Sequence, residues 1–307
     1  MKAVNDYWQN HGQNSQLKQL MAEVFQDADV QKFLTDHEGD LSKEAISRGQ
    51  SKLYEYVHQK NIIKQGGISV APGYTPKLVY AAGQIDVSYV PTKEHLEKQA
   101  AQELHDRVST MDMPKNIREA NFHDFWLEGV NSSPSRTAAF GKLVSFSQEY
   151  DGHHFMPGYY LTGKFGVGKT YLLGALANAL AQKGIKSTLV HFPTFAVKMK
   201  SAIGNNTTDQ LRDQVKGAPI LMLDDIGADT LSPWLRDEVL GVILEYRMQE
   251  ELPTFFSSNF NMDELTAHLG QDNNGNSEPL KAQRIMERIR FLSRELVISG
   301  KNLRVKD

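Results

Sequence analysis

The feature that most constrains the fold is an eight-residue segment in the middle of the chain, Gly163-Lys164-Phe165-Gly166-Val167-Gly168-Lys169-Thr170. A glycine, four residues and then Gly-Lys-Thr is the spacing of a phosphate-binding loop. An apolar run typical of a strand, Tyr159 to Leu161, precedes the segment, and a helical run rich in Ala and Leu, Tyr171 to Gln182, follows it. A strand, a glycine-rich turn and a helix in this order favour an α/β fold with a parallel sheet.

Each residue type in this loop suits the binding of phosphate anions. Glycines let the backbone curl so that successive N–H groups face inward, and the following helix adds the positive end of its dipole. We expect Lys169 to reach the outer phosphates and the Thr170 hydroxyl to ligate Mg²⁺. The sequence therefore predicts ATP and Mg²⁺ as cofactors, and it predicts nucleotide contacts from Gly163, Lys164, Phe165, Gly166, Val167, Gly168, Lys169, Thr170 and Tyr171.

Two carboxylates follow a second apolar run. Ile220 to Leu223 has the composition of a buried strand, and Asp224 and Asp225 come directly after it. Because ligands of parallel sheets bind outside the carboxyl ends of the strands, both acids are expected beside the glycine-rich loop. We expect Asp224 to orient magnesium and Asp225 to polarise the water that attacks the terminal phosphate, which is a catalytic role. An exposed acidic turn is the simpler alternative.

A third apolar run, Thr254 to Ser258, also ends in polar residues. Its end is expected at the same crevice, where Ser258 or Asn259 would sense the terminal phosphate. We assign this catalytic role to Asn259. A polar strand end is common, so the prediction depends on the two other motifs.

A basic helical run extends from Lys281 to Arg294 and contains Arg284, Arg288, Arg290 and Arg294. A solvated helix face is the simple explanation. Alternatively, one arginine acts on the nucleotide of a neighbouring subunit, because a guanidinium neutralises charge that develops on a transferred phosphoryl group. That interpretation requires self-association.

The chain of 307 residues is longer than one compact core usually holds. The first 100 residues show helical periodicity and then two alternating runs, Lys77 to Tyr80 and Ile85 to Val90, which predict a hairpin. A polar helical stretch, Thr92 to Thr110, follows. We therefore predict an N-terminal α+β module over residues 1–100, a linker over 101–112, and an α/β P-loop domain over 113–307 whose parallel sheet is flanked by helices.

Composition excludes several classes of protein. The formal net charge of −3 offers no general attraction for nucleic acid, so such binding needs a local basic patch. The absence of cysteine excludes disulfides, thiolate nucleophiles and Cys-ligated zinc. No run approaches the roughly 20 apolar residues that span a bilayer, and no secretory signal is evident. We expect a cytoplasmic protein with no membrane partner.

Several segments together are more specific than the phosphate-binding loop. From Met113 to Leu303 the chain resembles the AAA+ domain of DnaC/DnaI-type replicative helicase loaders. The resemblance rests on Gly158-Tyr159-Tyr160-Leu161-Thr162-Gly163, His191-Phe192-Pro193, Leu223-Asp224-Asp225-Ile226-Gly227 and Arg284-Ile285-Met286-Glu287-Arg288-Ile289. In the N-terminal region, Gly73-Tyr74-Thr75-Pro76-Lys77-Leu78 and Ile85 to Pro91 resemble the module by which the DnaI branch of this family binds its helicase.

This resemblance implies an ATPase that loads the hexameric replicative helicase onto single-stranded DNA during primosome assembly and replication initiation or restart, together with other primosome proteins. It implies self-association through the AAA+ domain, with Arg288 matching the arginine finger and Arg284 the weaker candidate. It also implies slow, switch-like hydrolysis, because the strand ends in Asp-Asp where many AAA+ ATPases have Asp-Glu.

Two departures from the family pattern lead to further expectations. Many relatives carry zinc-binding cysteines around the N-terminal glycine-rich turn, whereas this chain has Ser69, Ala71 and Thr92 there, so we expect no zinc. The sequence after the last strand is short, so we expect no full helical lid domain. For DNA contact we consider Lys198 and Lys200, with Phe192 or Phe195 available for stacking on bases.

Other functions remain open on the sequence alone. An IstB-like, transposition-associated DNA-binding ATPase has a similar core but a different N-terminal part. A non-hydrolysing adaptor would retain ATP only as a structural element. A small-molecule kinase is a third possibility, although no acceptor-binding signature is evident.

Overall fold

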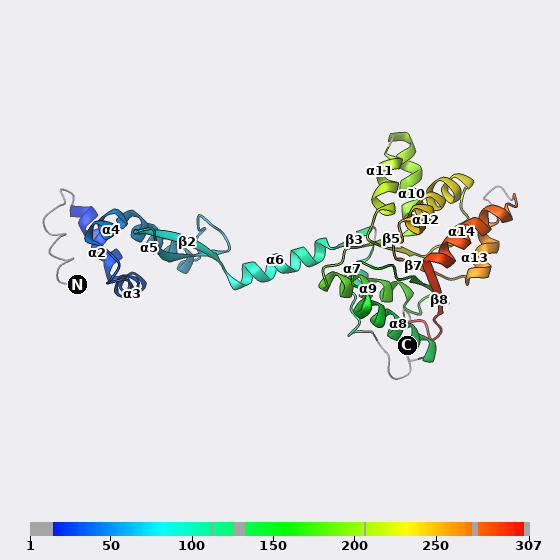
Figure 1. Ribbon diagram of the computed structural model, residues 1–307, viewed down its shortest axis with the longest axis horizontal. Helices are drawn as coiled ribbons and strands as arrows, with labels where there is room; N and C mark the ends of the chain where they lie inside the picture. Colours follow the sequence, from blue (N-terminus) through cyan, green and yellow to red (C-terminus); the bar gives the residue numbers. More distant parts are fainter. Residues whose placement is uncertain (1–14, 112, 126–132, 206, 272–275, 304–307) are drawn as a thin grey trace. The chain divides into compact units, whose positions relative to one another are not determined.

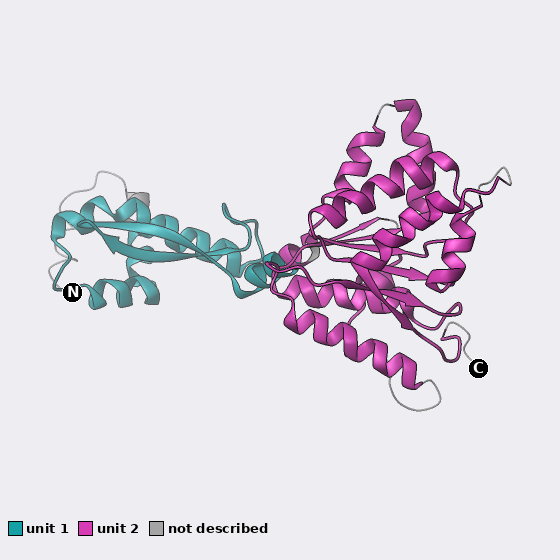
Figure 2. Ribbon diagram, turned by 45° about the vertical axis from the view of Figure 1, so that its right-hand side comes forward, with its two compact units in different colours: residues 1–101 teal, residues 102–307 magenta. Residues whose placement is uncertain are grey.

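The computed structural model describes residues 15–111, 113–125, 133–205, 207–271 and 276–303. The chain divides into two compact units, residues 1–101 and residues 102–307 (Figure 2). Within the described residues, no helix has both the length and the apolar character needed to cross a membrane.

In its described part, the first unit begins with the helices α2 (Ser15–Gln26), α3 (Ala28–Asp36), α4 (Lys43–Arg48) and α5 (Gln50–Lys64). Side chains cap two of them: the Asp27 carboxylate accepts hydrogen bonds from the first turn of α3, and the Ser42 hydroxyl accepts one from Ala45 N–H in α4. The predicted helices and hairpin of this region are confirmed. Their apolar faces form one small core of Met21, Val24, Val30, Phe33, Leu53, Tyr56, Leu78 and Ile85.

The hairpin of this unit consists of β1 (Tyr74–Ala81) and β2 (Gln84–Pro91), which pair in antiparallel register. Its two-residue turn has φ values of 51° at Ala82 and 76° at Gly83. Positive φ at both turn positions matches the right-handed twist of the strands. The hairpin packs on α5 through Leu78 and Ile85, the two hairpin residues buried in the core of the unit.

The segment predicted to be a linker, residues 101–112, contains regular secondary structure. Helix α6 (Lys93–Asp106) extends through its first half, and β3 (Val108–Met111) follows as a strand of the main sheet. Val108 packs against the core, and the Arg107 guanidinium donates to Ala181 O at 3.3 Å. These contacts tie the end of the segment to the second unit.

The second unit has a six-stranded parallel sheet, which confirms the predicted fold class (Figure 1). The spatial order is β3, β5 (Ser187–His191), β6 (Ile220–Asp224), β7 (Thr254–Ser258), β4 (Gly158–Thr162) and β8 (Ser293–Val297). The five strands predicted from apolar runs are confirmed, and β3 was not predicted. The central strand β6 is buried on both faces, which explains its unbroken apolar sequence.

Helices cover both faces of this sheet (Figures 1 and 2). One face carries α7 (Lys115–Arg118), α8 (Pro134–Glu149) and α9 (Lys169–Gln182) over one apolar core. The other face carries α10 (Phe192–Ala202), α11 (Thr208–Lys216), the π-helix η3 (Leu235–Gly241), α12 (Val242–Gln249), α13 (Met262–Leu269) and α14 (Pro279–Leu292) over a second core. A short 3₁₀ turn, η2 (Ile203–Asn205), follows α10.

Candidate functional site

The phosphate-binding loop joins β4 to α9 at the carboxyl edge of the sheet. Gly166 has φ +75° and Gly168 has φ +101°, backbone conformations that favour glycine. A Cβ atom would lie 1.8 Å from Asn302 Oδ1 at Gly166 and 3.1 Å from the Phe125 ring at Gly168. Helix α9 begins at Lys169, and no side chain caps its first turn. The N–H groups of that turn therefore have no competing side-chain cap and can donate to a bound anion. The backbone therefore offers an anion cradle that side chains would obstruct.

Lys169 is buried beneath this loop. Its Nζ donates to Gly163 O at 2.6 Å, to Lys164 O at 3.0 Å and to Asn259 Oδ1 at 2.9 Å. The ammonium group is thus held between the loop and the end of β7.

Asp224 lies at the end of β6 and is 3% exposed. The Ser257 hydroxyl donates to Asp224 Oδ1 at 2.6 Å, and the Thr170 side chain is near enough to lower the pKa of the Asp224 carboxyl. Burial raises the pKa of Asp224, the nearby charge of Asp225 raises it further, and the Ser257 and Thr170 side chains oppose both effects in part.

Asp225 has φ +60°, a left-handed conformation that is uncommon for a non-glycine residue. Its N–H donates to Ser257 Oγ at 3.0 Å, and Asn259 Nδ2 donates to Asp225 Oδ1 at 3.1 Å. Asn259 therefore contacts both Lys169 and Asp225, with its amide oxygen toward the lysine and its amide nitrogen toward the carboxylate. These two contacts fix the orientation of the amide.

These groups line one cavity of about 1050 Å³. It is large enough for a nucleotide, because typical small-molecule sites are roughly 300 to 1,000 Å³. Its lining includes the polar groups described above, together with His191 and Thr194. The lining also includes a largely apolar set: Met113, Pro114, Asn116, Ile117, Asp124, Phe125, Tyr171 and Leu303.

The structure brings most of the predicted site residues together. Phe165 to Tyr171, Asp224, Asp225 and Asn259 all line the cavity. Gly163 and Lys164 contribute through the carbonyl groups that bind Lys169. Ser258 is absent from the lining; its hydroxyl instead donates to Ile226 O at 2.6 Å. Of the two candidates at this strand end, Asn259 is the one that reaches the cavity.

The predicted arginine finger lies elsewhere, on α14. Arg288 Nη1 donates to Gly241 O at 3.0 Å, and its Nη2 pairs with Glu245 at 2.5 Å. Arg284, one turn earlier, is exposed. Neither lines the cavity of its own chain. The predicted basic helix ends at Leu292, so Arg294 belongs to β8 and not to a helix.

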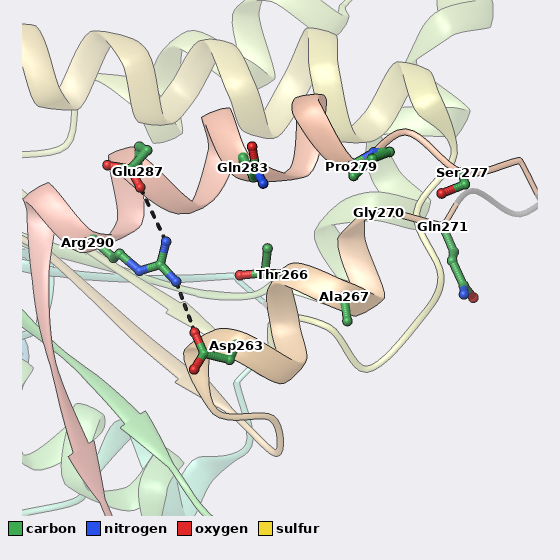
Figure 3. A pocket seen from close by; sticks show the side chains of 10 residues that line it. All are labelled: Asp263, Thr266, Ala267, Gly270, Gln271, Ser277, Pro279, Gln283, Glu287 and Arg290. Atoms are coloured by element: carbon green, nitrogen blue, oxygen red, sulfur yellow. Dashed lines mark hydrogen bonds and ion pairs between the residues drawn. The ribbon is translucent and has the colours of Figure 1, made fainter.

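A second hollow lies between α13 and α14 (Figure 3). Its charged groups pair with one another: Arg290 contacts Asp263 at 3.1 Å and Glu287 at 3.3 Å. Since this arginine is already engaged by two carboxylates, the hollow lacks the unshared positive charge of an anion site.

Sequence reasoning did not identify three parts of the main site. Ser257 was passed over because a serine within a strand carries no local signal. The apolar part of the lining comes largely from residues 113–125, which no motif marks. Leu303 also lines the cavity, and its N–H donates to Gly166 O at 2.9 Å. A long-range contact of that kind has no signature in the sequence.

The residues of the site fit a magnesium-bound nucleoside triphosphate. Mg²⁺ is usually held by one or two carboxylates, substrate phosphates and several waters. Asp224 and Thr170 both line the cavity beside the glycine cradle, and the Thr170 side chain lowers the pKa of the Asp224 carboxyl. The N–H groups at the uncapped start of α9 can donate hydrogen bonds to phosphate oxygens.

A parallel sheet with this loop, this acidic strand end and an asparagine directly after the neighbouring strand is typical of an AAA+ type P-loop protein. Comparison with protein families agrees: residues 118–259 match the bacterial DnaA ATPase domain, and residues 1–89 match the N-terminus of primosomal protein DnaI. The chain is 38% identical over 295 residues to the replicative helicase loader DnaI of Bacillus subtilis (strain 168), which covers 94% of this chain and 93% of that protein. The chain belongs to the DnaI family of replicative helicase loaders.

Solved structures of similar proteins match about two thirds of the chain. A crystal structure of DnaI is 42% identical, covers 63% of this chain and 98% of its own, and superposes with a TM-score of 0.57. A primosome component from Streptococcus pyogenes serotype M3 is 40% identical, covers 67% of this chain and 98% of its own, and has a TM-score of 0.55.

Proposed function

We propose that this chain binds ATP with Mg²⁺, hydrolyses it slowly, and uses that cycle to load the hexameric replicative helicase onto single-stranded DNA. Loading would serve primosome assembly and replication initiation or restart. The observation that carries the proposal is the meeting of Lys169, Asp224, Asp225 and Asn259 in one cavity of a chain from a family of helicase loaders.

Each side chain has a definite role in this proposal. The cradle N–H groups and Lys169 bind the phosphates, and Asn259 holds the lysine beside Asp225. Asp225 accepts a hydrogen bond from the attacking water and orients it toward the terminal phosphate. Asp224 and Thr170 would hold Mg²⁺, which neutralises phosphate charge when bound. The apolar part of the cavity lining would receive the base.

The N-terminal module, residues 1–100, is proposed to bind the helicase. Residues 101–112 are proposed as the connection and residues 113–307 as the ATPase domain. The match of residues 1–89 to the DnaI N-terminus supports this assignment.

We further propose that ATPase domains associate so that Arg288 of one subunit serves the nucleotide of its neighbour. Mixing variants tests this. A chain with Arg288→Ala keeps its own active site but lacks the finger, whereas a chain with Asp225→Asn has the reverse defect. If the finger acts in trans, the mixture hydrolyses ATP faster than either variant alone. Equal rates before and after mixing would exclude it.

Single-stranded DNA is proposed to contact α10, where Lys198 and Lys200 are exposed. The expected stacking of bases on Phe192 or Phe195 is wrong, because these rings are 1% and 0% exposed and belong to the apolar core under the sheet. Binding at this helix would therefore be electrostatic, and its affinity should fall steeply with salt.

The decisive experiment uses the full chain, its hexameric helicase and circular single-stranded DNA, with helicase bound to the circles as the readout. Loading should require ATP and should be lost with Lys169→Ala. Single-turnover hydrolysis in the same mixture should be lost with Asp225→Asn. If loading persists in both variants, the chain acts as an adaptor and the proposed ATPase cycle is refuted.

A further inference from the structure

One buried hydroxyl contacts both carboxylate residues of the site. Ser257, on β7, is 1% exposed. Its Oγ donates to Asp224 Oδ1 at 2.6 Å and accepts from Asp225 N–H at 3.0 Å. The sheet register brings this about, because Leu223 pairs with Phe256 and the next residues on the two strands, Asp224 and Ser257, therefore stand side by side.

The direction of these hydrogen bonds is fixed by chemistry. A backbone N–H can only donate, so Ser257 Oγ must accept from Asp225 and keeps its single proton for Asp224. A distance of 2.6 Å is typical of a hydroxyl that donates to a carboxylate. Ser257 therefore orients Asp224 as an acceptor, and no alternative hydroxyl rotation satisfies both partners.

The second hydrogen bond of Ser257 is with the backbone N–H of Asp225. This residue has φ +60°, a backbone conformation that non-glycine residues rarely adopt. The hydrogen bond from its N–H to Ser257 Oγ stabilises that conformation and so sets where the Asp225 carboxylate lies relative to Asn259. The same hydroxyl thus fixes the side chain of one aspartate and the backbone of the other.

We propose that Ser257 is a positioning residue that sets the geometry of Asp224 for Mg²⁺ and of Asp225 for the attacking water. The inference rests on the proposed function, in which the cavity binds ATP with Mg²⁺. Ser257 lines the cavity, but the role proposed for it is indirect. Its effect passes through the two aspartates, as the partners that orient metal ligands commonly do.

The neighbouring serine provides a matched control. Ser258 is 0% exposed, and its hydroxyl also makes two hydrogen bonds, to Ile226 O at 2.6 Å and from Phe260 N–H at 3.1 Å. It contacts neither aspartate within the described residues. Ser258→Ala therefore removes an equally buried hydroxyl from the same strand without touching the acidic pair.

The test measures binding of the analogue adenosine β,γ-methylene triphosphate to the full chain by calorimetry, with Mg²⁺ and with EDTA. The ratio of the two dissociation constants is the gain in affinity due to Mg²⁺. We expect Ser257→Ala to reduce that gain by about 10-fold or more, while affinity in EDTA changes by less than about 2-fold. Ser258→Ala should keep the gain, and Ser257→Thr, which restores a hydroxyl, should recover it.

Each result decides a question. If Ser257→Ala keeps the full gain, or if Ser258→Ala loses it equally, Ser257 has no special role and the inference is overturned while the proposed function stands. If the unaltered chain shows no Mg²⁺-dependent nucleotide binding, the proposed function fails and the inference fails with it. Thermal unfolding of each variant confirms that it is folded; should Ser257→Ala not fold, Ser257→Thr and Ser257→Cys supply the comparison, since the thiol is the weaker donor.

Discussion

Asp224 should reduce the stability of the ATPase domain, and its replacement by asparagine should reveal by how much. The carboxylate is 3% exposed, and desolvation is the main cause of its raised pKa. Asparagine has nearly the same shape and keeps an oxygen that accepts the Ser257 hydroxyl proton. We therefore expect Asp224→Asn to raise the free energy of unfolding while it removes Mg²⁺-dependent nucleotide binding.

The pH dependence follows from the direction of the pKa shift. The ordinary value for aspartate is 3.8, and the folded-state pKa of Asp224 is higher. Between those two values the folded protein binds more protons than the unfolded chain, so stability due to this group falls as pH rises. Below 3.8 both states are protonated and the penalty is absent. The gain from Asp224→Asn is thus complete above the folded pKa and disappears toward acid.

The size of the gain can be bounded. Replacing buried ion pairs with apolar residues is often neutral or stabilises proteins by about 1 to 4 kcal/mol; here one charge is removed and Ser257 and Thr170 already offset part of its penalty, so we expect about 1 to 2 kcal/mol. For a domain of this size, that corresponds to an increase of roughly 2 to 8 °C in Tm.

Calorimetry in EDTA at pH 7.5, without nucleotide, measures this gain. Asp229→Asn makes the same chemical change at an exposed position and should stay within about 0.5 kcal/mol of the unaltered chain. If Asp224→Asn unfolds at the same or a lower temperature, the hydrogen bonds of Asp224 outweigh its desolvation, and the reasoning is refuted.

Three further substitutions have definite expected outcomes. Lys169→Ala should weaken ATP binding by at least about 10-fold in calorimetry, whereas exposed Lys186→Ala should not change it. Arg247→Ala should lower the free energy of unfolding by about 3 kcal/mol in a denaturant titration, because this fully buried guanidinium donates four hydrogen bonds, to the Thr254 hydroxyl of β7, to Lys216 O at the end of α11, and to the carbonyl oxygens of Ala218 and Pro253 in the turns before β6 and β7. A loss under about 1 kcal/mol would contradict that. Gly158→Ala should prevent stable pairing of β4 with β7, because its Cβ would lie 2.1 Å from Thr254 O, and a native-like circular dichroism melt of this variant would refute the steric argument.

Local patterns predicted the fold well where one segment carries its own signal. The loop from Gly163 to Thr170 predicts a strand before it and a helix after it, and buried parallel strands such as β6 appear as unbroken apolar runs. Strand β3 had no such signal. It has four residues, two of them polar, and it follows a long polar helix. Its pairing with β5 is a long-range contact, so helical periodicity from Thr92 onward was extended too far.

The site was predictable to the same extent. The rule that parallel strands end at a common edge placed Asp224, Asp225 and Asn259 together, and the structure agrees. The rule does not say which side chains touch. Ser257 contacts the two aspartates, and Ser258 does not, because β6 and β7 pair with Leu223 opposite Phe256. A shift of one residue would change which serine lies beside Asp224, and sequence alone does not reveal the register.

A chain of contacts also connects Lys169 in the phosphate-binding loop to the two aspartates at the end of β6. Lys169 binds Asn259, Asn259 binds Asp225, and Ser257 joins the Asp225 backbone to Asp224. Phosphate oxygens at the cradle would compete with Asn259 Oδ1 for the lysine ammonium, because both are acceptors and the ammonium has three protons. Since the Asn259 amide nitrogen donates to Asp225, phosphate bound at the loop would act through Asn259 on the residue proposed to orient water. Asn259→Ala should therefore weaken hydrolysis more than it weakens ATP binding, and an equal loss in both would show that the amide only binds phosphate.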